Sequence, residues 1–201
     1  MVISCDESSG FCELKSYART TGFVDLFYSV RDRFKSRLPS DLSSFSFYEA
    51  KIREGRYRRK DKIVYDANRH LLLYYRNSKL KRKAVVKGRV YDPLSAYYVF
   101  SVLVRKGNVK AVESFAYFVT TGKKEVIPEI AFLGQEEVKT GCGVRKALKF
   151  SLKVAAKGLL MARDAGKPVQ IWLDKDEGYL VKALVPTRWG NIKIILSKLD
   201  I

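Results

Sequence analysis

The sequence predicts a mainly β protein: a strongly curved antiparallel meander or barrel-like sheet, with one well-defined helix over 92–104 packed in or across it. Two observations carry this prediction. Apolar and charged residues alternate with a period of two along much of the chain, as they do in half-buried antiparallel strands. The stretch "DPLSAYYVFSVLVRKG" at 92–107 breaks that alternation and is mostly apolar.

The alternation is clearest in two segments. In "VRKALKFSLKVA" one face carries Leu148, Phe150, Leu152 and Val154, and the other carries Lys149, Ser151 and Lys153. In "KLKRKAVVK" lysines fill one face, and the opposite face carries Leu80, Arg82, Ala84 and Val86. Both segments therefore predict strands with one buried face.

Similar runs recur along the chain, separated by short turn signals rich in Gly, Asn and Asp. They are "FCELKSYART", "SFSFYEAKIRE", "YRRKDKIVY", "HLLLYYR", "SFAYFVTTG", "EVIPEIAFLG", "VQIWLDK", "YLVKALVPTR" and "NIKIILSKL". Roughly ten or eleven strands in a single domain over 1–201 follow from this pattern. A sheet of that length curls or closes on itself, which protects its edges.

One early segment, "TTGFVDLFYSVRDRF", fits two structures. Phe23, Leu26, Phe27 and Val30 have the spacing of a helical face, and the same stretch also fits a bent strand. The sequence leaves both open.

The segment from Asp92 has the signals of both helix ends. Asp92 is a good N-cap and Pro93 suits the first helical position, while Arg105, Lys106 and Gly107 are typical of a C-terminus. Apolar residues fill two stripes of this helix, so we expect it to be enclosed nearly all round. If the curved sheet has a hollow interior, the helix is its plug or lid. The candidate ligand-binding residues are then Leu94, Tyr97, Tyr98, Phe100 and Val102.

Charge is the dominant feature of the composition. Lys and Arg number 39 against 21 acids, which gives a formal net charge of +18. Such a chain attracts polyanions: anionic lipid, lipopolysaccharide or nucleic acid. The alternative is a solvated surface that keeps strands from aggregating.

Nucleic acid binding is the less favoured of these options. Basic and aromatic residues interleave in "REGRYRRKDKIVYDANRHLLLYYR", so that tyrosines would stack bases while basic side chains meet phosphates. The residues concerned are Tyr57, Tyr65, Tyr74, Tyr75, Arg58, Arg59 and Lys60. No zinc-finger, helix-turn-helix or RNA-binding signature accompanies them.

Catalytic and metal sites find little support in the sequence. His70 is the only histidine and no C-x-x-C pair occurs, so we expect neither a catalytic triad nor zinc, and no cofactor. The acids of "WLDKDEG" and the glycines of "TGCGVRK" fit hairpin turns better than a calcium or phosphate loop. The protein is therefore expected not to be an enzyme.

Three cysteines leave two options for Cys5 and Cys12. They flank the turn-like "DESSGF" and can face each other across a hairpin, in which case they form a disulfide in an oxidising compartment. Two thiols are the favoured option, and Cys142 has no partner in either case.

No signal-peptide pattern is seen at the start of the sequence, since Met1 is followed at once by the strand-like "VISC". We expect a segment upstream of it. The longest strongly apolar uncharged run, Leu94 to Val104, is about half of what a membrane span needs, so no transmembrane segment is predicted.

Several stretches taken in order resemble a known family. They are Arg53-Glu54-Gly55, Asp92-Pro93-Leu94-Ser95, Trp172-Leu173 with Asp176, and Gly190-Asn191-Ile192, with "ARTTGFVDLFYSVRDRFKSRL" before them and "FLGQEEVKTGCG" between. Over most of residues 17 to 199 the chain resembles the bacterial exported-protein family known as domain of unknown function 3108. The resemblance implies a curved or barrel-like antiparallel sheet in the periplasm or cell envelope. It brings no activity and no catalytic residues. The cytoplasm is the alternative location, and it goes with the nucleic-acid hypothesis.

These observations favour a non-enzymatic envelope protein that binds a lipid or other apolar ligand inside a curved sheet. A structural or interaction module with a solid core, whose partner is another envelope protein, is the alternative. A basic nucleic-acid-binding protein is a further alternative. The oligomeric state is not predicted.

Overall fold

A computed structural model of the chain describes residues 2–6, 8–20, 22, 25, 27–153, 167–187 and 190–198. The chain divides into two compact units, which are described separately. Unit 1 contains Met1–Ala96 and Phe118–Glu125, and unit 2 contains Tyr97–Tyr117 and Val126–Ile201. The single domain over 1–201 stays a prediction.

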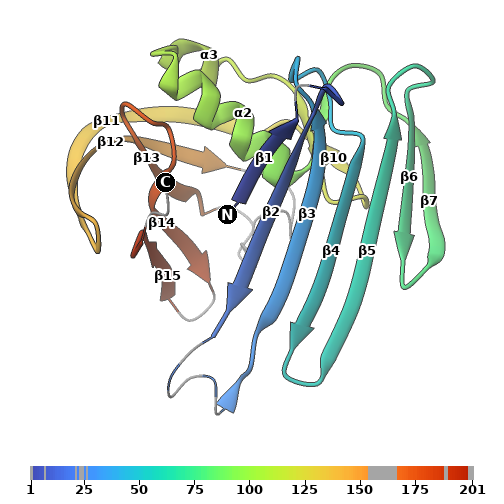
Figure 1. Ribbon diagram of the computed structural model, residues 1–201, viewed down its shortest axis with the longest axis horizontal. Coiled ribbons are helices and arrows are strands. Elements are labelled where there is room, and N and C mark those ends of the chain that lie inside the picture. Colours follow the sequence, from blue (N-terminus) through green and yellow to red (C-terminus); the bar gives the residue numbers. More distant parts are fainter. Residues whose placement is uncertain are drawn as a thin grey trace. The chain divides into compact units, whose positions relative to one another are not determined.

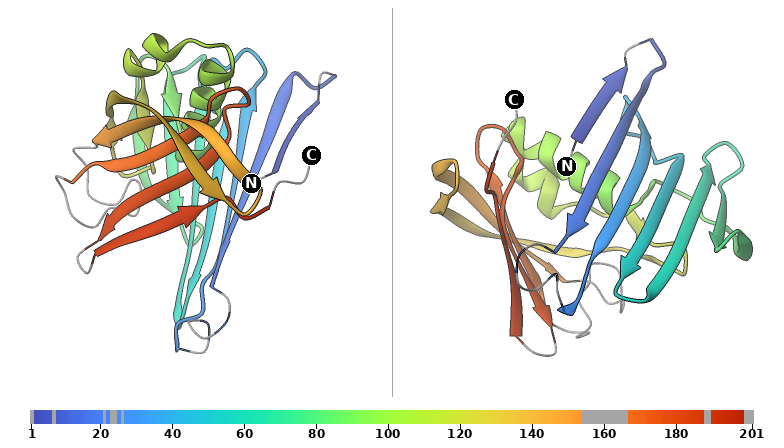
Figure 2. Two further views of the ribbon diagram at one scale, coloured as in Figure 1. Left: turned by 90° about the vertical axis from the view of Figure 1, so that its left-hand side faces the viewer. Right: turned by 60° about the horizontal axis from the view of Figure 1, so that its bottom comes forward.

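Unit 1 is built on a seven-stranded antiparallel sheet (Figure 1). Its strands are β1 (Val2–Asp6), β2 (Phe11–Arg19), β3 (Arg31–Pro39), β4 (Phe47–Glu54), β5 (Tyr57–Asp66), β6 (Leu71–Arg76) and β7 (Lys79–Val85). They lie side by side in sequence order, so this part of the chain is a meander, and β2 to β5 run next to one another in Figure 2. The predicted mainly β, antiparallel fold class is confirmed.

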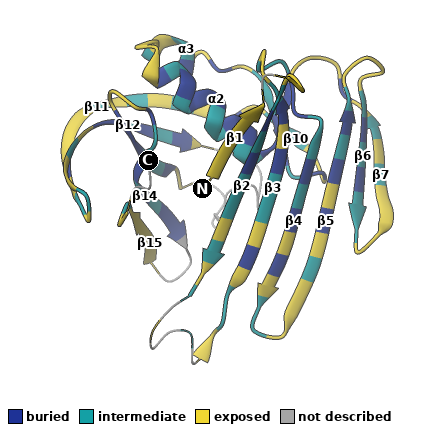
Figure 3. Ribbon diagram, viewed as in Figure 1, coloured by how far each residue is buried: buried dark blue, intermediate teal, exposed yellow. Residues whose placement is uncertain are grey.

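One face of this sheet forms the core of unit 1, because alternate side chains of each strand point to the same side. Leu14, Leu38, Ile63 and Leu72 are fully buried on this inner face. The alternation of buried and exposed residues is visible along β4 and β5 in Figure 3.

The inner face also buries polar side chains toward one end. Asp61 on β5 accepts a hydrogen bond from Tyr74 and forms ion pairs with Arg59 and Arg76 at 3.0 and 2.9 Å. Asp32 on β3 is buried too and accepts a bond from the Arg53 N–H at 2.8 Å. Burial raises the pKa of the Asp32 carboxyl.

A small sheet follows in the order β10 (Glu125–Val126), β9 (Phe118–Thr120) and β8 (Val90–Tyr91). Here β8 and β9 pair in parallel, so the predicted single meander is interrupted. The run "EVIPEIAFLG" was expected to be one strand, but it divides into β10 and the start of β11. Pro128 lies at the break, where its missing N–H cannot contribute to a ladder.

Helix α2 (Pro93–Arg105) follows β8 and agrees with the predicted helix to within a residue at each end. Oδ1 of Asp92 accepts bonds from the N–H groups of Leu94 and Ser95, and the Ser95 hydroxyl accepts one from the Asp92 N–H. These reciprocal bonds form a capping box with Ser in place of the usual Glu. The predicted N-cap is therefore confirmed.

The C-terminus of α2 also ends as predicted. Gly107 has a φ of +70°, its N–H donates to the Val104 carbonyl, and the N–H of Asn108 donates to the Leu103 carbonyl. This is a Schellman motif, which needs the left-handed conformation that glycine adopts without strain. None of residues 93–104 is exposed, so the predicted enclosure of the helix is confirmed.

Unit 2 contains the second antiparallel meander. Its strands are β11 (Glu129–Thr140), β12 (Gly143–Lys153), β13 (Val169–Asp174), β14 (Leu180–Thr187) and β15 (Gly190–Ile195), again in sequence order. The short helix α3 (Val109–Glu113) precedes them, capped by the Asn108 side chain. Phe150, Leu173 and Val181 are fully buried. The turns at 140–143 and 174–178 join hairpins, as predicted.

Helix α2 packs against the turn between β13 and β14. The Tyr97 hydroxyl accepts a bond of 2.7 Å from the Leu180 N–H, and burial raises the pKa of Tyr97 to about 12. Gly178 has a φ of +72°, and a Cβ there would lie 2.2 Å from the Ser101 carbonyl oxygen. Only glycine fits this close approach of two backbones.

Two further results differ from the sequence analysis. The sequence did not identify β3, because Asp32 and Ser36 occupy inner-face positions and hide its alternation. A bulge between Tyr74 and Tyr75 shifts the register of β7, so Leu80 lies opposite Tyr75 and is exposed rather than buried. Phe23, Leu26, Val154 and Trp189 lie outside the described residues.

Cys5 and Cys12 form a disulfide, which was the less favoured of the two options for these residues. Cys5 and Cys12 lie directly opposite each other across β1 and β2 and are joined by a disulfide. The expectation of two thiols was therefore wrong, because the turn between the strands brings the two side chains into register. Cys142 is not bonded to another cysteine.

Candidate basic surface of unit 1

The outer face of the seven-stranded sheet carries a row of positive charges on neighbouring strands. Because directly opposed residues of antiparallel strands share a face, the register places side chains of β2, β3, β4 and β5 together. We call the exposed members at one end of this face the basic patch: Arg19, Arg31, Arg33, Lys51, Arg53, Arg58 and Lys60.

Like charges face each other within the basic patch. Arg19 lies opposite Arg31, and Arg53 lies opposite Arg58. Lys51 lies opposite Lys60, with Glu49 2.9 Å from each of them. Directly opposed like charges destabilise a sheet. The sheet therefore holds these cations together at a cost in folding free energy.

Few acids neutralise the patch. Asp25 forms a two-pronged ion pair with Arg31, at 2.7 and 2.5 Å, and this guanidinium lowers the pKa of the Asp25 carboxyl. Among the residues that the structure describes, no carboxylate pairs with Arg19, Arg33, Arg53 or Arg58. Arg58 donates through Nη1 to the carbonyls of Gly55 and Tyr57, at 2.6 and 2.8 Å. Without a carboxylate partner, these arginines keep their positive charge and their other donors for an external oxyanion.

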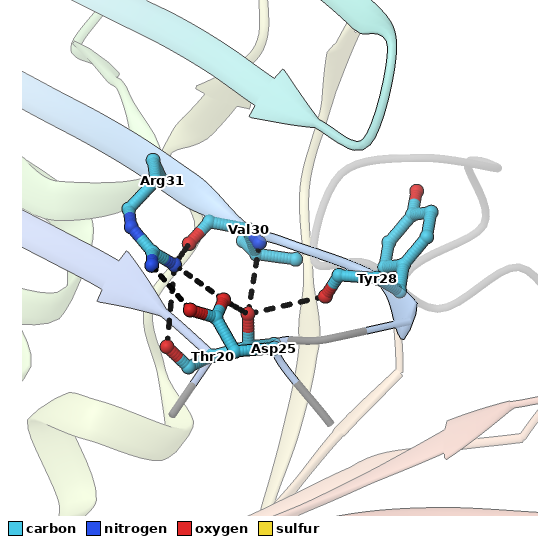
Figure 4. Close-up of polar contacts among 5 residues, drawn as sticks. All are labelled: Thr20, Asp25, Tyr28, Val30 and Arg31. Carbon is cyan, nitrogen blue, oxygen red and sulfur yellow. Dashed lines mark hydrogen bonds and ion pairs between the residues drawn. The ribbon is translucent and has the colours of Figure 1, made fainter. Parts of the chain in front are cut away.

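The connection from β2 to β3 is braced beside the patch. The Thr20 hydroxyl donates to Asp25 at 2.5 Å and accepts a bond from the Val30 N–H at 2.9 Å. Figure 4 shows Thr20, Asp25 and Arg31 pointing toward one another, with the ring of Tyr28 pointing away from them. This bonding fixes the position of Arg31 at the start of β3.

The same connection contacts the turn between β4 and β5. The Gly55 N–H donates to the Ser29 carbonyl at 2.8 Å, and the Tyr28 hydroxyl bonds Glu54 at 3.2 Å. Gly55 has a φ of +53°, and a Cβ there would lie 3.4 Å from the Tyr28 ring. The Arg53-Glu54-Gly55 turn and the 20–30 connection are therefore one bonded structure at the end of the sheet.

A groove of about 540 Å³ lies on the same outer face, away from the patch. Its lining includes Phe11 and Phe47 with Lys35 and Arg37, and Arg37 lies 4.2 Å from the centre of the Phe11 ring. Glu13 pairs with Lys35 here at 2.6 Å. The groove is thus more nearly neutral than the patch.

Unit 2 has a separate charged cluster around Trp172. The amines of Lys149 and Lys182 lie 4.9 and 4.0 Å from the centre of the indole ring, and the indole N–H donates to Glu136. Trp172 is fully buried, so the two lysines and Glu136 cover it. These contacts explain the Trp in "WLDKDEG" through packing.

Comparison with known proteins assigns the chain to a family. The model described as "Protein of unknown function (DUF3108)" matches residues 12–197. The chain belongs to this family. No curated protein matches it.

The DUF3108 chain is also similar to a solved structure, that of a beta-barrel-like protein of domain of unknown function DUF1849 from Brucella abortus. The two share 12% identity with a TM-score of 0.59, and the match covers 98% of this chain and 92% of that chain. At this identity the likeness shows the fold alone.

Two stretches that carried the DUF3108 resemblance have structural explanations. The Asp-Pro-Leu-Ser stretch is the capping box of α2, and Arg-Glu-Gly is the turn that contacts Ser29 and Tyr28. Both stretches therefore have a role in the folded structure of the chain.

The predicted ligand residues on α2 are packed in different ways. Phe100 and Val102 are buried, and Phe100 contacts the Phe115 ring at 4.6 Å. Tyr97 bonds Leu180, while Leu94 and Tyr98 are half-buried. A ligand site at these residues stays a prediction. Among the described residues, no helix has the length and apolarity needed to cross a bilayer.

The residues proposed for nucleic acid do not share a surface. Tyr65 and Tyr74 are buried in the core and Arg59 points to the inner face, whereas Tyr57 and Arg58 are exposed. Alternation along β5 puts Arg58 and Lys60 on the outer face and Arg59 and Tyr65 on the inner face, while Tyr57 has the inner-face spacing but is exposed at the first position of the strand. His70 lies in the turn before β6, and Asp174 accepts bonds from the N–H groups of its own hairpin turn.

Sequence reasoning missed most of the basic patch. It considered Arg58 and Lys60 for phosphate binding and named Arg53 only in the family resemblance. It did not single out Arg19, Arg31, Arg33 or Lys51, because these come together only through strand pairing. The available signal was the stretch "RDRFKSR", in which basic residues recur at every second position.

Proposed function

We propose that the protein is a non-enzymatic component of the cell envelope that binds the phosphate groups of anionic lipid through the basic patch. The opposed pair Arg53–Arg58 carries the proposal, because no carboxylate among the described residues pairs with either arginine. This pair costs folding free energy. A layer of phosphates outside the sheet offsets that cost and also attracts Arg19 and Arg33 of the same face.

The disulfide supports an envelope location. Disulfides persist in oxidising compartments such as the periplasm and are rare in the cytosol. The Cys5–Cys12 bond is therefore expected of an exported protein. A cytoplasmic location is the alternative, and it predicts that both cysteines are reduced in the cell.

The burial of two tyrosines argues against the nucleic-acid surface suggested by the sequence from Arg53 to Arg76. A nucleic-acid surface combines phosphate contacts with bases stacked on neighbouring rings. The burial of Tyr65 and Tyr74 removes half of the tyrosines that would stack. For α2, the contacts of Tyr97 and Phe100 favour a role in the core over the predicted ligand site.

The test is flotation of the purified chain with lipid vesicles. We expect binding to vesicles that contain phosphatidylglycerol, weaker binding as salt rises, and no binding to pure phosphatidylcholine. Vesicles that contain lipopolysaccharide distinguish the two sources of phosphate. Absence of binding to both anionic surfaces at low salt would overturn the proposal. Tighter binding to duplex DNA at equal salt would favour the nucleic-acid alternative.

Two matched triple variants test whether binding to anionic vesicles depends on the basic patch. The triple variant Arg19→Gln, Arg33→Gln, Arg53→Gln removes three charges from the patch. Its control, Lys81→Gln, Lys106→Gln, Lys123→Gln, removes three exposed charges elsewhere. At about 1 kcal/mol for each cation near an anionic surface, the patch variant loses roughly 100-fold in affinity and the control loses much less. Equal losses would show that only net charge matters.

A further inference from the structure

The exposed aromatic side chains among the described residues all lie toward one end of the seven-stranded sheet. Among the residues that the structure describes, Tyr17, Phe27, Tyr28 and Tyr57 are the exposed aromatics, at 61%, 75%, 48% and 51% of their full accessibility. We call these four the aromatic tip. All lie beside the basic patch, at the end of the sheet where β2 leads to β3 and β4 leads to β5.

Hydrogen bonds and strand pairing fix three members of the aromatic tip, Tyr17, Tyr28 and Tyr57, and Phe27 directly precedes Tyr28 in the chain. Tyr28 is tied to the β4–β5 turn through Glu54, and Val30 forms a bridge with Glu54. Tyr57 is the first residue of β5, directly after that turn. On β2, Tyr17 lies opposite Arg33 of the patch. The four rings are therefore presented by one braced end of unit 1.

Exposed aromatics are costly in water, and a cluster of them indicates a contact surface. Aromatic rings surrounded by arginines suit the boundary between lipid headgroups and acyl chains. Tyrosine concentrates at that boundary because it has an apolar ring and a polar end, and arginine binds phosphate with two parallel bonds.

The charges at this end also suit a bilayer. Arg53, Arg56 and Arg58 are exposed around Tyr57. The nearby acids are engaged within the protein, since Asp25 pairs with Arg31 and Glu54 accepts the Tyr28 bond. Repulsion between carboxylates and lipid phosphates is thereby reduced.

From this geometry we infer that the aromatic tip inserts into the interfacial layer of an anionic bilayer while the basic patch binds the phosphates above it. The inference rests on the proposed function and adds an orientation, with the β2–β3 and β4–β5 end of unit 1 toward the lipid. Phe27 and Tyr57 are the inserted side chains, since one is the most exposed aromatic and the other stands among arginines.

Tryptophan scanning tests the insertion. Phe27→Trp and Tyr57→Trp are compared with Val85→Trp, which replaces an exposed residue of β7 away from the tip. The native Trp172 and Trp189 give the same background in all variants. With phosphatidylglycerol vesicles whose acyl chains carry bromine, we expect a blue shift and quenching at positions 27 and 57 but not at 85.

A second pair of variants separates insertion from charge attraction. Phe27→Ser with Tyr57→Ser leaves every charge in place. It should weaken vesicle binding by about tenfold or more at high salt, where apolar contacts dominate. Val85→Ser with Val144→Ser, two exposed apolar residues elsewhere, should change it little.

The outcomes distinguish this inference from the proposed function. If the wild type binds anionic vesicles and the arginine variant does not, but positions 27 and 57 show no more quenching than position 85, insertion is overturned and lipid binding stands. If the wild type does not bind anionic vesicles, both fail. Blue shifts at 27 and 57 with duplex DNA but not with vesicles would also overturn the insertion.

Discussion

The hydroxyl of Ser36 on β3 donates a 2.5 Å hydrogen bond to the carboxylate of Asp92, which lies 56 positions further along the chain. Asp92 is completely buried, and its carboxylate also accepts bonds from the backbone of Leu94 and from Ser95. Burial raises the pKa of this carboxyl. A strand of the seven-stranded sheet and the first turn of α2 are thus joined through one side chain.

Replacing Asp92 should destabilise the protein in proportion to the bonds that are lost. Asp92→Ala removes the helix cap and leaves the Ser36 hydroxyl and two backbone N–H groups without their acceptor. We expect the free energy of unfolding to fall by about 2 to 4 kcal/mol, measured by urea denaturation. Asp92→Asn retains a capping oxygen and should cost less than half as much. Equal losses in the two variants would contradict a role in capping.

Asp32 should make stability depend on pH. Its carboxyl is buried near Glu54 and Arg59, and burial raises its pKa above the ordinary value of 3.8. The folded chain therefore holds the proton more tightly than the unfolded chain. The stabilisation from the protonated Asp32 carboxyl is complete at pH values below the pKa that this group has in the unfolded chain. It is lost as the pH rises through the pKa that the group has in the folded chain.

The variant Asp32→Asn cannot lose a proton, so its unfolding temperature should improve relative to the wild type as pH rises from about 3 to 7. Thermal unfolding at a series of pH values measures this difference. Asp176→Asn, at an exposed acid, is the control and should show no such trend. If the unfolding temperature of Asp32→Asn relative to the wild type stays constant over this pH range, protonation of Asp32 does not contribute to stability.

Gly178→Ala should be much more disruptive than an alanine at another turn glycine. The added Cβ meets the Ser101 carbonyl of α2 in addition to straining the backbone. We expect a loss of about 2 to 4 kcal/mol in unfolding free energy. Gly143→Ala is the matched control, because φ is +96° there and a Cβ meets nothing within 4 Å. It should cost about 1 kcal/mol, from backbone strain alone.

Arg53→Glu should change stability and binding in opposite directions. The new carboxylate lies opposite Arg58, so a repulsive pair becomes attractive and the protein gains about 0.2 to 1 kcal/mol in stability at low salt. The same change reverses a charge of the basic patch and should weaken binding to anionic vesicles about 10- to 100-fold. Thermal unfolding and flotation measure the two effects. Lys81→Glu, on β7, should produce neither.

The sequence predicted most elements of the fold because their residues alternate or carry capping signals. Asp92, Pro93 and Gly107 determine both ends of α2 locally, so no tertiary information was needed to place them. Strand β3 was not predicted, because its inner positions hold Asp32 and Ser36, whose burial depends on partners elsewhere in unit 1.

The basic patch depends on register, which a single sequence does not state. Arg19 and Arg31 are separated by a connection, and only pairing of β2 with β3 places them opposite each other. Alternation places Tyr57 and Tyr65 on the same side of β5, but Tyr57 is exposed at the start of the strand and Tyr65 is buried in the core. Composition therefore predicted either attraction to polyanions or a solvated basic surface, but not which basic residues lie together.

The disulfide between Cys5 and Cys12 attaches the edge strand β1 to its neighbour β2 in the seven-stranded sheet. Every residue of β1 is exposed, so little burial holds this strand against β2. Were β1 to detach, the edge of β2 would accept a strand from another molecule, which is how sheets polymerise. The covalent tie keeps β1 beside β2 through any such opening. An oxidised molecule therefore cannot readily exchange its first strand with a neighbour, even where many copies crowd onto one surface.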